Sequence, residues 1–135
     1  MRILGIDPGE RRVGIAVSDP LLITAQGLET FDTQSGTDLI DHVRDLVERY
    51  EVAEIVVGNP VGLSGKEGAA SAKATELARR LRVSLSVPVT LWDERLSTRE
   101  ANRVLRGERA GKGAVDKVAA VIILQSYLDY RRRSG

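Results

Sequence analysis

The beginning of the chain, LGIDPGERRVGIAVSD, consists of two short apolar runs separated by an aspartate and a Pro-Gly pair. The runs at residues 2–7 and 12–19 are rich in β-branched residues, which is typical of strands. The Pro-Gly pair favours a turn between them, and residues 22–31 have the composition of a third strand. Because the connections are short, we expect an antiparallel meander. The fold therefore begins with a sheet, and Asp7 should end its innermost strand.

The rest of the chain alternates between helical and strand-like segments. Apolar residues at helical spacing predict helices near 39–50, 69–81 and 115–131. Buried-type runs predict strands at 53–61, stopping at Pro60, and at 88–97. Ser97 and Glu100 form a capping box, which predicts a short additional helix. Helical crossovers between the later strands imply parallel pairing. The sequence thus predicts an α/β fold with a mixed five-stranded sheet: three antiparallel N-terminal strands and two further strands parallel to the first. A length of 135 residues suits a single domain, 1–135.

Composition excludes several classes of site. The chain has no cysteine, which excludes disulfides, thiolate metal sites and a cysteine nucleophile. His42 is the one histidine, so a multi-histidine zinc site is also excluded. We expect His42 to be a surface or half-buried helix residue and not a catalytic base. No apolar run is long enough to span a membrane, and the N-terminus shows no signal-peptide pattern; a cytoplasmic protein is expected.

Carboxylates stand at the predicted ends of two strands and at the start of the last helix. Asp7 ends the first strand, Asp93 and Glu94 lie near the end of a later one, and Asp116 opens the final helix. In an open α/β sheet, sites lie beyond the carboxyl ends of the parallel strands, so these segments are expected to meet at one edge. Trp92 should point to the opposite side of its strand from Asp93 and pack in the core.

Each of these carboxylates also has an ordinary structural explanation. Asp7 can cap the Pro-Gly turn, Asp93 and Glu94 can pair with a neighbouring arginine, and Asp116 can favour the helix N-terminus. Their coincidence at one edge favours a metal site. Carboxylate oxygens without His or Cys ligands favour Mg²⁺ or Mn²⁺, and two such ions about 4 Å apart suit phosphodiester hydrolysis.

Basic residues are concentrated just before the last helix and at its start. Five basic residues lie from Arg103 to Lys117, against two acidic ones. On the metal-site hypothesis, this segment would hold phosphates of a nucleic acid; the alternative is a solvated loop. Arg95 would contact a scissile or adjacent phosphate, or would merely neutralise Asp93. The candidate phosphate-binding residues are Arg95, Arg103, Arg106, Arg109 and Lys112.

The motifs LGIDPGERRVGIAVSD, VVGNPVGLSG, DERLST and DKVAAVIILQSYLD together resemble the YqgF (RuvX) family over essentially the whole chain. Members are described as pre-16S rRNA nucleases or Holliday-junction resolvases. The resemblance implies an RNase H-like fold with helices on both faces of the sheet, and acidic site residues at Asp7, Glu94 and Asp116, with Asp93 as a fourth metal ligand. Wider RNase H-like resolvases often carry an acid at the end of the fourth strand, where this sequence has Asn59.

Two other functions compete with a nuclease. The glycine turn after the first strand also resembles the phosphate loop of actin-like ATPases, but those proteins need two such domains to enclose a nucleotide. A non-catalytic RNA-binding ribosome-assembly factor is the other alternative. With one Trp, one Phe and three Tyr, the chain offers few rings for base stacking, so recognition through shape and charge fits better. A junction resolvase would also require a two-fold homodimer.

Overall fold

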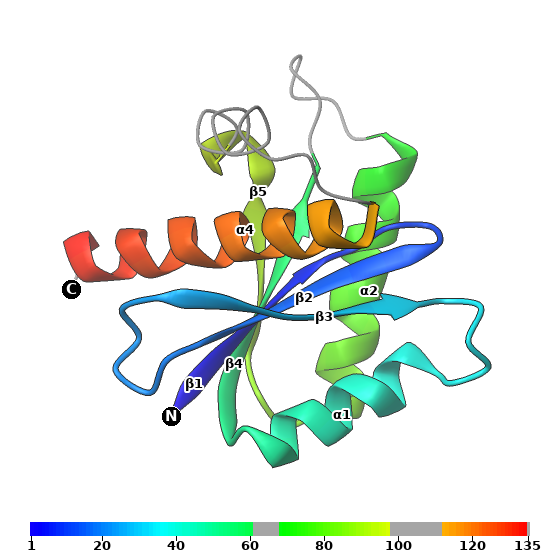
Figure 1. Ribbon diagram of the computed structural model, residues 1–135, viewed down its shortest axis with the longest axis horizontal. Coiled ribbons are helices and arrows are strands. Elements are labelled where there is room, and N and C mark those ends of the chain that lie inside the picture. The colour runs from blue at the N-terminus through cyan, green and yellow to red at the C-terminus, as the bar shows by residue number, and fades with distance from the viewer. Residues whose placement is uncertain (61–67, 98–111, 135) are drawn as a thin grey trace.

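The computed structural model describes residues 1–60, 68–97 and 112–134, without the side chains of residues 95, 97 and 112–116. Figure 1 shows the strands and the helices that pack on them. The elements, in chain order, are β1 (Arg2–Asp7), β2 (Arg12–Ser18), β3 (Ala25–Asp32), α1 (Leu39–Arg49), β4 (Val52–Asn59), α2 (Ala69–Ser84), β5 (Val89–Asp93), the 3₁₀-helix η1 (Glu94–Ser97) and α4 (Lys112–Ser134).

The strands form one five-stranded mixed sheet in the order β3-β2-β1-β4-β5, with β1 in the centre. β1 pairs antiparallel with β2, and β2 pairs antiparallel with β3. On its other side β1 pairs parallel with β4, which pairs parallel with β5. The predicted α/β class, the N-terminal meander and the two added parallel strands are all confirmed.

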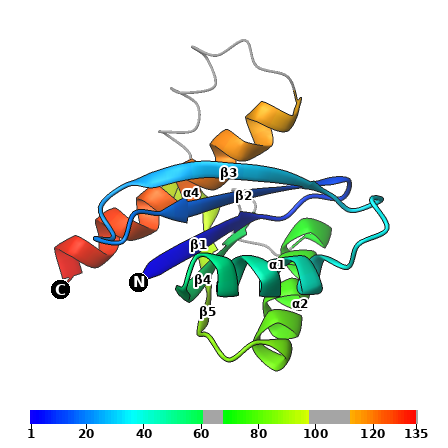
Figure 2. The same cartoon turned by 60° about the horizontal axis from the view of Figure 1, so that its bottom comes forward.

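Helices cover both faces of the sheet (Figure 2). Leu4 and Ile6 of β1 belong to the larger apolar cluster, which includes side chains of α1 and α2. Ile3 belongs to the second cluster, which is formed with α4. Gly5 lies directly against α4, since a methyl group there would stand 2.8 Å from Leu124 Cβ. Alternate residues of β1 therefore face opposite helical layers, as the period of a strand requires.

Several strand boundaries differ from the predicted ones. β3 begins at Ala25 and not at residue 22, because the carboxylate of Asp19 accepts three backbone N–H groups and holds the preceding residues in a loop. β4 begins at Val52, one residue earlier than predicted, and it stops before Pro60 as predicted, because Pro60 has no N–H to continue the ladder. β5 ends at Asp93, the partner of Asn59, and the chain turns into η1.

Two helices are longer than predicted. α2 continues to Ser84, and α4 runs from Lys112 to Ser134. The short helix predicted from residue 97 onward falls outside the described residues. Over the part of the chain that the structure describes, no helix is long and apolar enough to cross a membrane.

Candidate active site

The carboxyl ends of β1, β4 and β5 meet at one edge of the sheet. Ile6 pairs with Val57, so Asp7, the next residue of β1, is level with Gly58 of β4. Gly58 in turn pairs with Trp92 of β5, which directly precedes Asp93 and Glu94. The register thus gathers residues from three segments that lie far apart in sequence.

Glu94 extends across the end of β4 toward the centre of the sheet. A methyl group on Gly58 would stand 2.9 Å from Glu94 Oε1 and 3.4 Å from its carboxyl carbon. The carboxylate therefore lies against the bare backbone of Gly58, the β4 residue that is level with Asp7. Both acids are half-buried, so they are accessible to a ligand.

Asp7 and Glu94 belong to the face of the sheet that α4 covers. Gly5, two residues before Asp7, packs against α4, and alternation assigns Asp7 to the same side. Ile123 of α4 lies close to Gly58 on the same side as Glu94, because a methyl group on Gly58 would meet both side chains. The structure thus brings these two predicted site residues to one end of one face.

Asn59 and Asp93 are assigned to the opposite face. Leu91, two residues before Asp93, packs against the cluster beneath α1 and α2, and alternation places Asp93 on that side. Asn59 Oδ1 accepts a hydrogen bond of 2.7 Å from Ser71 Oγ on α2. The Asn59 amide at the end of β4 is therefore part of the contact between β4 and α2.

Asp116 lies near the start of α4, the helix that covers the face of Asp7 and Glu94. Farther along this helix, Leu124 packs on Gly5. The backbone of Asp116 thus lies on the same side of the sheet as the other two acids. Its side chain lies outside the described part. Among the described side chains, no group of three His, Asp or Glu residues is arranged to hold a metal ion.

The predicted phosphate-binding residues fall largely outside the description. Arg103, Arg106 and Arg109 belong to residues 98–111, and only the backbone is described for Arg95 in η1 and for Lys112 at the start of α4. Their contact with phosphate therefore stays a prediction.

The predicted placements of His42 and Trp92 agree with the structure. His42 is half-buried on α1, where its Nε2 lies 2.5 Å from Glu29 Oε1 and its ring lies 4.9 Å from that of Phe31. Trp92 packs edge-on against Tyr127, with ring centroids 5.3 Å apart, and donates a hydrogen bond to Ser126 Oγ. Both rings therefore serve packing between the sheet and a helix.

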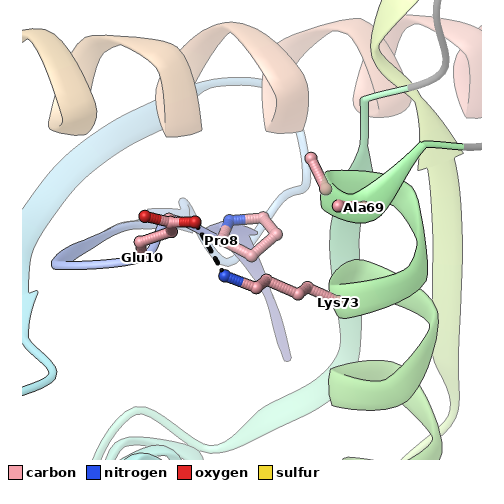
Figure 3. A pocket seen from close by; sticks show the side chains of 6 residues that line it. Pro8, Glu10, Ala69 and Lys73 are labelled. Atoms are coloured by element: carbon pink, nitrogen blue, oxygen red, sulfur yellow. Dashed lines mark hydrogen bonds and ion pairs between the residues drawn. The ribbon is translucent and has the colours of Figure 1, made fainter.

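Two features of this edge were not predicted from the sequence. Gly58 is the first, and the signal for it was available, because a glycine inside a buried strand often marks a close approach. The second is a cavity of about 260 Å³ between the β1–β2 turn and α2, drawn in Figure 3. Its lining residues come from two segments that are far apart in the chain: Pro8, Gly9, Glu10, Ala69, Ala70 and Lys73.

Comparison with known proteins gives matches to nucleases and resolvases. The family model described as "RuvX: Holliday junction resolvase" matches residues 1–130. A "Putative pre-16S rRNA nuclease" of Halothermothrix orenii is 44% identical over 137 residues, covering 98% of each chain. Among solved structures, T. thermophilus RuvC in complex with a Holliday junction substrate has a TM-score of 0.64 at 18% identity, covering 98% of this chain and 96% of that one. The Fowlpox virus resolvase with Holliday junction DNA has a TM-score of 0.60 at 12% identity, covering 97% and 99%.

Proposed function

The chain belongs to the RuvX family, and from this premise we propose that it is a divalent-metal-dependent nuclease that hydrolyses phosphodiester bonds in structured nucleic acid. The observation that carries the proposal is the position of the Glu94 carboxylate against Gly58, level with Asp7 on the central strand. Two half-buried carboxylates at the ends of β1 and β5, the strands on either side of β4, supply oxygens for a cation site.

The donor set fits Mg²⁺ or Mn²⁺. Asp7 and Glu94 supply hard carboxylate oxygens, which these ions prefer, and Asp116 would supply the third from α4. A cation held between the two carboxylates would offset any repulsion between them. Held by these residues, two such ions would supply activation of the attacking water and stabilisation of the leaving oxygen of a phosphodiester.

The chain's own residues would hold and orient the nucleic acid. Arg95 follows Glu94 directly, so it stands next to the acidic edge. The basic residues from Arg103 to Lys112 precede the part of α4 that carries Asp116. We propose that they bind phosphates that flank the reacting one, with recognition through backbone charge and shape.

Two substrates are consistent with the relatives. The Halothermothrix orenii protein is named for pre-16S rRNA, whereas the RuvC and Fowlpox structures contain Holliday junctions. Resolution of a junction requires two symmetric cuts and therefore a two-fold dimer. A protein that acts as a monomer is suited to single cuts in an RNA precursor, so the oligomeric state in solution separates the two substrates.

A cleavage panel with matched variants tests the proposal. The substrates are a four-way junction, a DNA duplex, single-stranded RNA and a precursor fragment of 16S rRNA, each with Mg²⁺, Mn²⁺ or EDTA. We expect metal-dependent cleavage of one substrate, loss of cleavage in Asp7→Asn, and full cleavage in Asp41→Asn, a change of an exposed acid on α1. Nucleic-acid binding that survives EDTA, with no cleavage of any substrate, would instead support the RNA-binding assembly factor.

A further inference from the structure

The cavity near the acidic edge combines apolar lining groups with one ion pair. The apolar lining comes from Pro8, Gly9, Ala69 and Ala70. At the rim, Lys73 Nζ lies 3.0 Å from Glu10 Oε1, and Figure 3 shows the two side chains reaching toward each other beside Pro8. A ligand of this cavity needs a flat apolar face and an edge that carries both donors and acceptors.

The volume of the cavity limits the size of the ligand that it can hold. Its volume of about 260 Å³ is below the about 300–1,000 Å³ that is usual for pockets holding drug-sized molecules. A single heterocyclic ring system fits this space better than a complete nucleotide. Ala69 and Ala70 are exposed on α2, so a ligand can reach the cavity from that side.

The ion pair at the rim can open to receive a ligand. The side chains of Lys73 and Glu10 are 57% and 86% exposed, and exposed pairs of this kind add little to stability. Separated, the ammonium group donates hydrogen bonds and the carboxylate accepts them. An incoming edge with one acceptor beside two donors would satisfy both groups.

We propose that this cavity binds a guanine base of the nucleic acid that is cleaved, an inference that rests on the proposed function. Guanine places its O6 acceptor beside the N1–H and N2–H donors, so O6 would face Lys73 and the two N–H groups would face Glu10. Adenine and cytosine present a single exocyclic amino group on this edge, and uracil and thymine a single N–H. The other bases therefore satisfy Glu10 less completely.

The cavity is also in the right place for such a contact. Pro8 follows Asp7 directly in the chain, so the cavity lies at the same end of the sheet as Asp7, on the side of α2, whereas Asp7 is assigned to the side of α4. A strand whose phosphate lies at Asp7 could insert an adjacent unpaired base between the β1–β2 turn and α2. The site would then select where along a strand the cut is made.

Binding of trinucleotides in EDTA tests this site without any cleavage. The probes carry guanine, inosine, adenine or an abasic position between two thymidines, and binding is followed through the backbone amide NMR signals of Ala69 and Ala70. Inosine lacks the N2 amino group, so we expect it to bind about two to ten times more weakly than guanine, as for loss of one typical hydrogen bond at an exposed rim. Glu10→Gln should reduce the preference for guanine, and Lys73→Met should weaken binding of guanine and inosine alike.

Two substitutions on α2 provide a matched pair. Ala70→Phe fills the cavity and should abolish the preference, whereas Ala72→Phe, at an exposed position of the same helix outside the cavity, should retain it. Equal binding of all four probes, or competition by inorganic phosphate alone, would overturn the proposal. Guanine preference without any nuclease activity would support the base site and remove the proposed function; cleavage without base preference would do the reverse.

Discussion

At the scale of single residues, Gly58 determines where the Glu94 carboxylate can lie. A side chain at this position would meet two groups at once: Ile123 Cδ1 at 2.6 Å and Glu94 Oε1 at 2.9 Å. The first contact belongs to the core beneath α4, and the second to the acidic edge. A single glycine therefore serves both packing and the candidate site, and the two roles can be separated.

Gly58→Ala should impair both stability and metal binding. We expect a loss of about 1–3 kcal/mol in the free energy of unfolding, as is usual for overpacking. Because the Glu94 carboxylate is displaced, the affinity for Mn²⁺ should fall about tenfold or more. Chemical denaturation and calorimetric titration measure the two effects.

The double variant Gly58→Ala with Ile123→Val separates the two roles. Valine lacks the Cδ1 atom that meets the new methyl group, so much of the stability should return. The contact with Glu94 remains, so Mn²⁺ affinity should stay low. Recovery of both properties would mean that Gly58 acts through packing alone.

At the scale of elements, α4 is fastened to β4 by polar contacts as well as by its apolar face. Glu54 of β4, whose side chain is 15% exposed, accepts hydrogen bonds from the Tyr127 hydroxyl and from Arg131 Nη1. Tyr127 also packs edge-on against Trp92 of β5. Since α4 carries Asp116, this cluster fixes the helix that would bring the third carboxylate to the site.

Tyr127→Phe should destabilise the protein while it preserves the ring packing. Loss of a hydrogen bond to a largely buried carboxylate costs about 1.5–3 kcal/mol. Tyr130→Phe is the matched control, because Tyr130 lies on the same helix, also contacts Trp92, and is 48% exposed. Equal unfolding midpoints in urea for the two variants would show that the hydroxyl of Tyr127 contributes nothing to the attachment.

The same contact predicts how stability changes at alkaline pH. Burial, and then the hydrogen bond to Glu54, raise the pKa of Tyr127 above 10.0. The unfolded chain therefore releases the phenolic proton at a lower pH than the folded chain does, so this contribution is complete below pH 10 and is lost as the pH rises through the folded pKa. The stability difference between wild type and Tyr127→Phe should shrink above that pH; a constant difference would contradict the assignment.

The element boundaries show how far the sequence could predict this fold. Periodicity predicted all five strands, because each strand alternates or is continuously apolar where it is buried. It extended β5 into residues 94–97, where the chain instead turns into η1. The start of β3 was missed because the hydrogen bonds that Asp19 accepts are not visible in an apolar pattern.

The candidate site could also be predicted only in part from the sequence. Strand ends and the parallel topology were enough to propose that Asp7 and Glu94 lie at one edge. The sequence alone did not show on which face each residue lies. That became clear from the strand register, which separates Asp93 from Glu94, and from the hydrogen bond between Asn59 and Ser71. The cavity depends on α2 approaching the β1–β2 turn, and no local pattern encodes that approach.

At the scale of the whole molecule, a net charge of +1 gives little general attraction for a nucleic acid. Binding must then depend on a local group of basic residues. If Arg106 and Arg109 each neutralise a phosphate, replacing both with glutamine should reduce the slope of log affinity against log salt by about 1.8 on duplex DNA. Anisotropy titrations over a range of salt concentrations measure this slope.

Arg44 and Arg49 provide the control for this measurement. Their side chains are 43% and 61% exposed on α1, where they pair with Asp41 and Asp45. Their replacement with glutamine changes the net charge of the molecule by the same amount as the Arg106 and Arg109 variant. The slope should stay at the wild-type value, and an equal decrease in both double variants would mean that only overall charge matters.

Calorimetric titration with Mn²⁺ tests the central claim most directly, because it asks whether Asp7 and Glu94 hold a cation together. Wild type and Asp41→Asn should bind Mn²⁺ with equal affinity. Asp7→Asn and Glu94→Gln should each weaken binding by about tenfold or more while circular dichroism stays unchanged. Wild-type affinity in both of these variants would contradict the account.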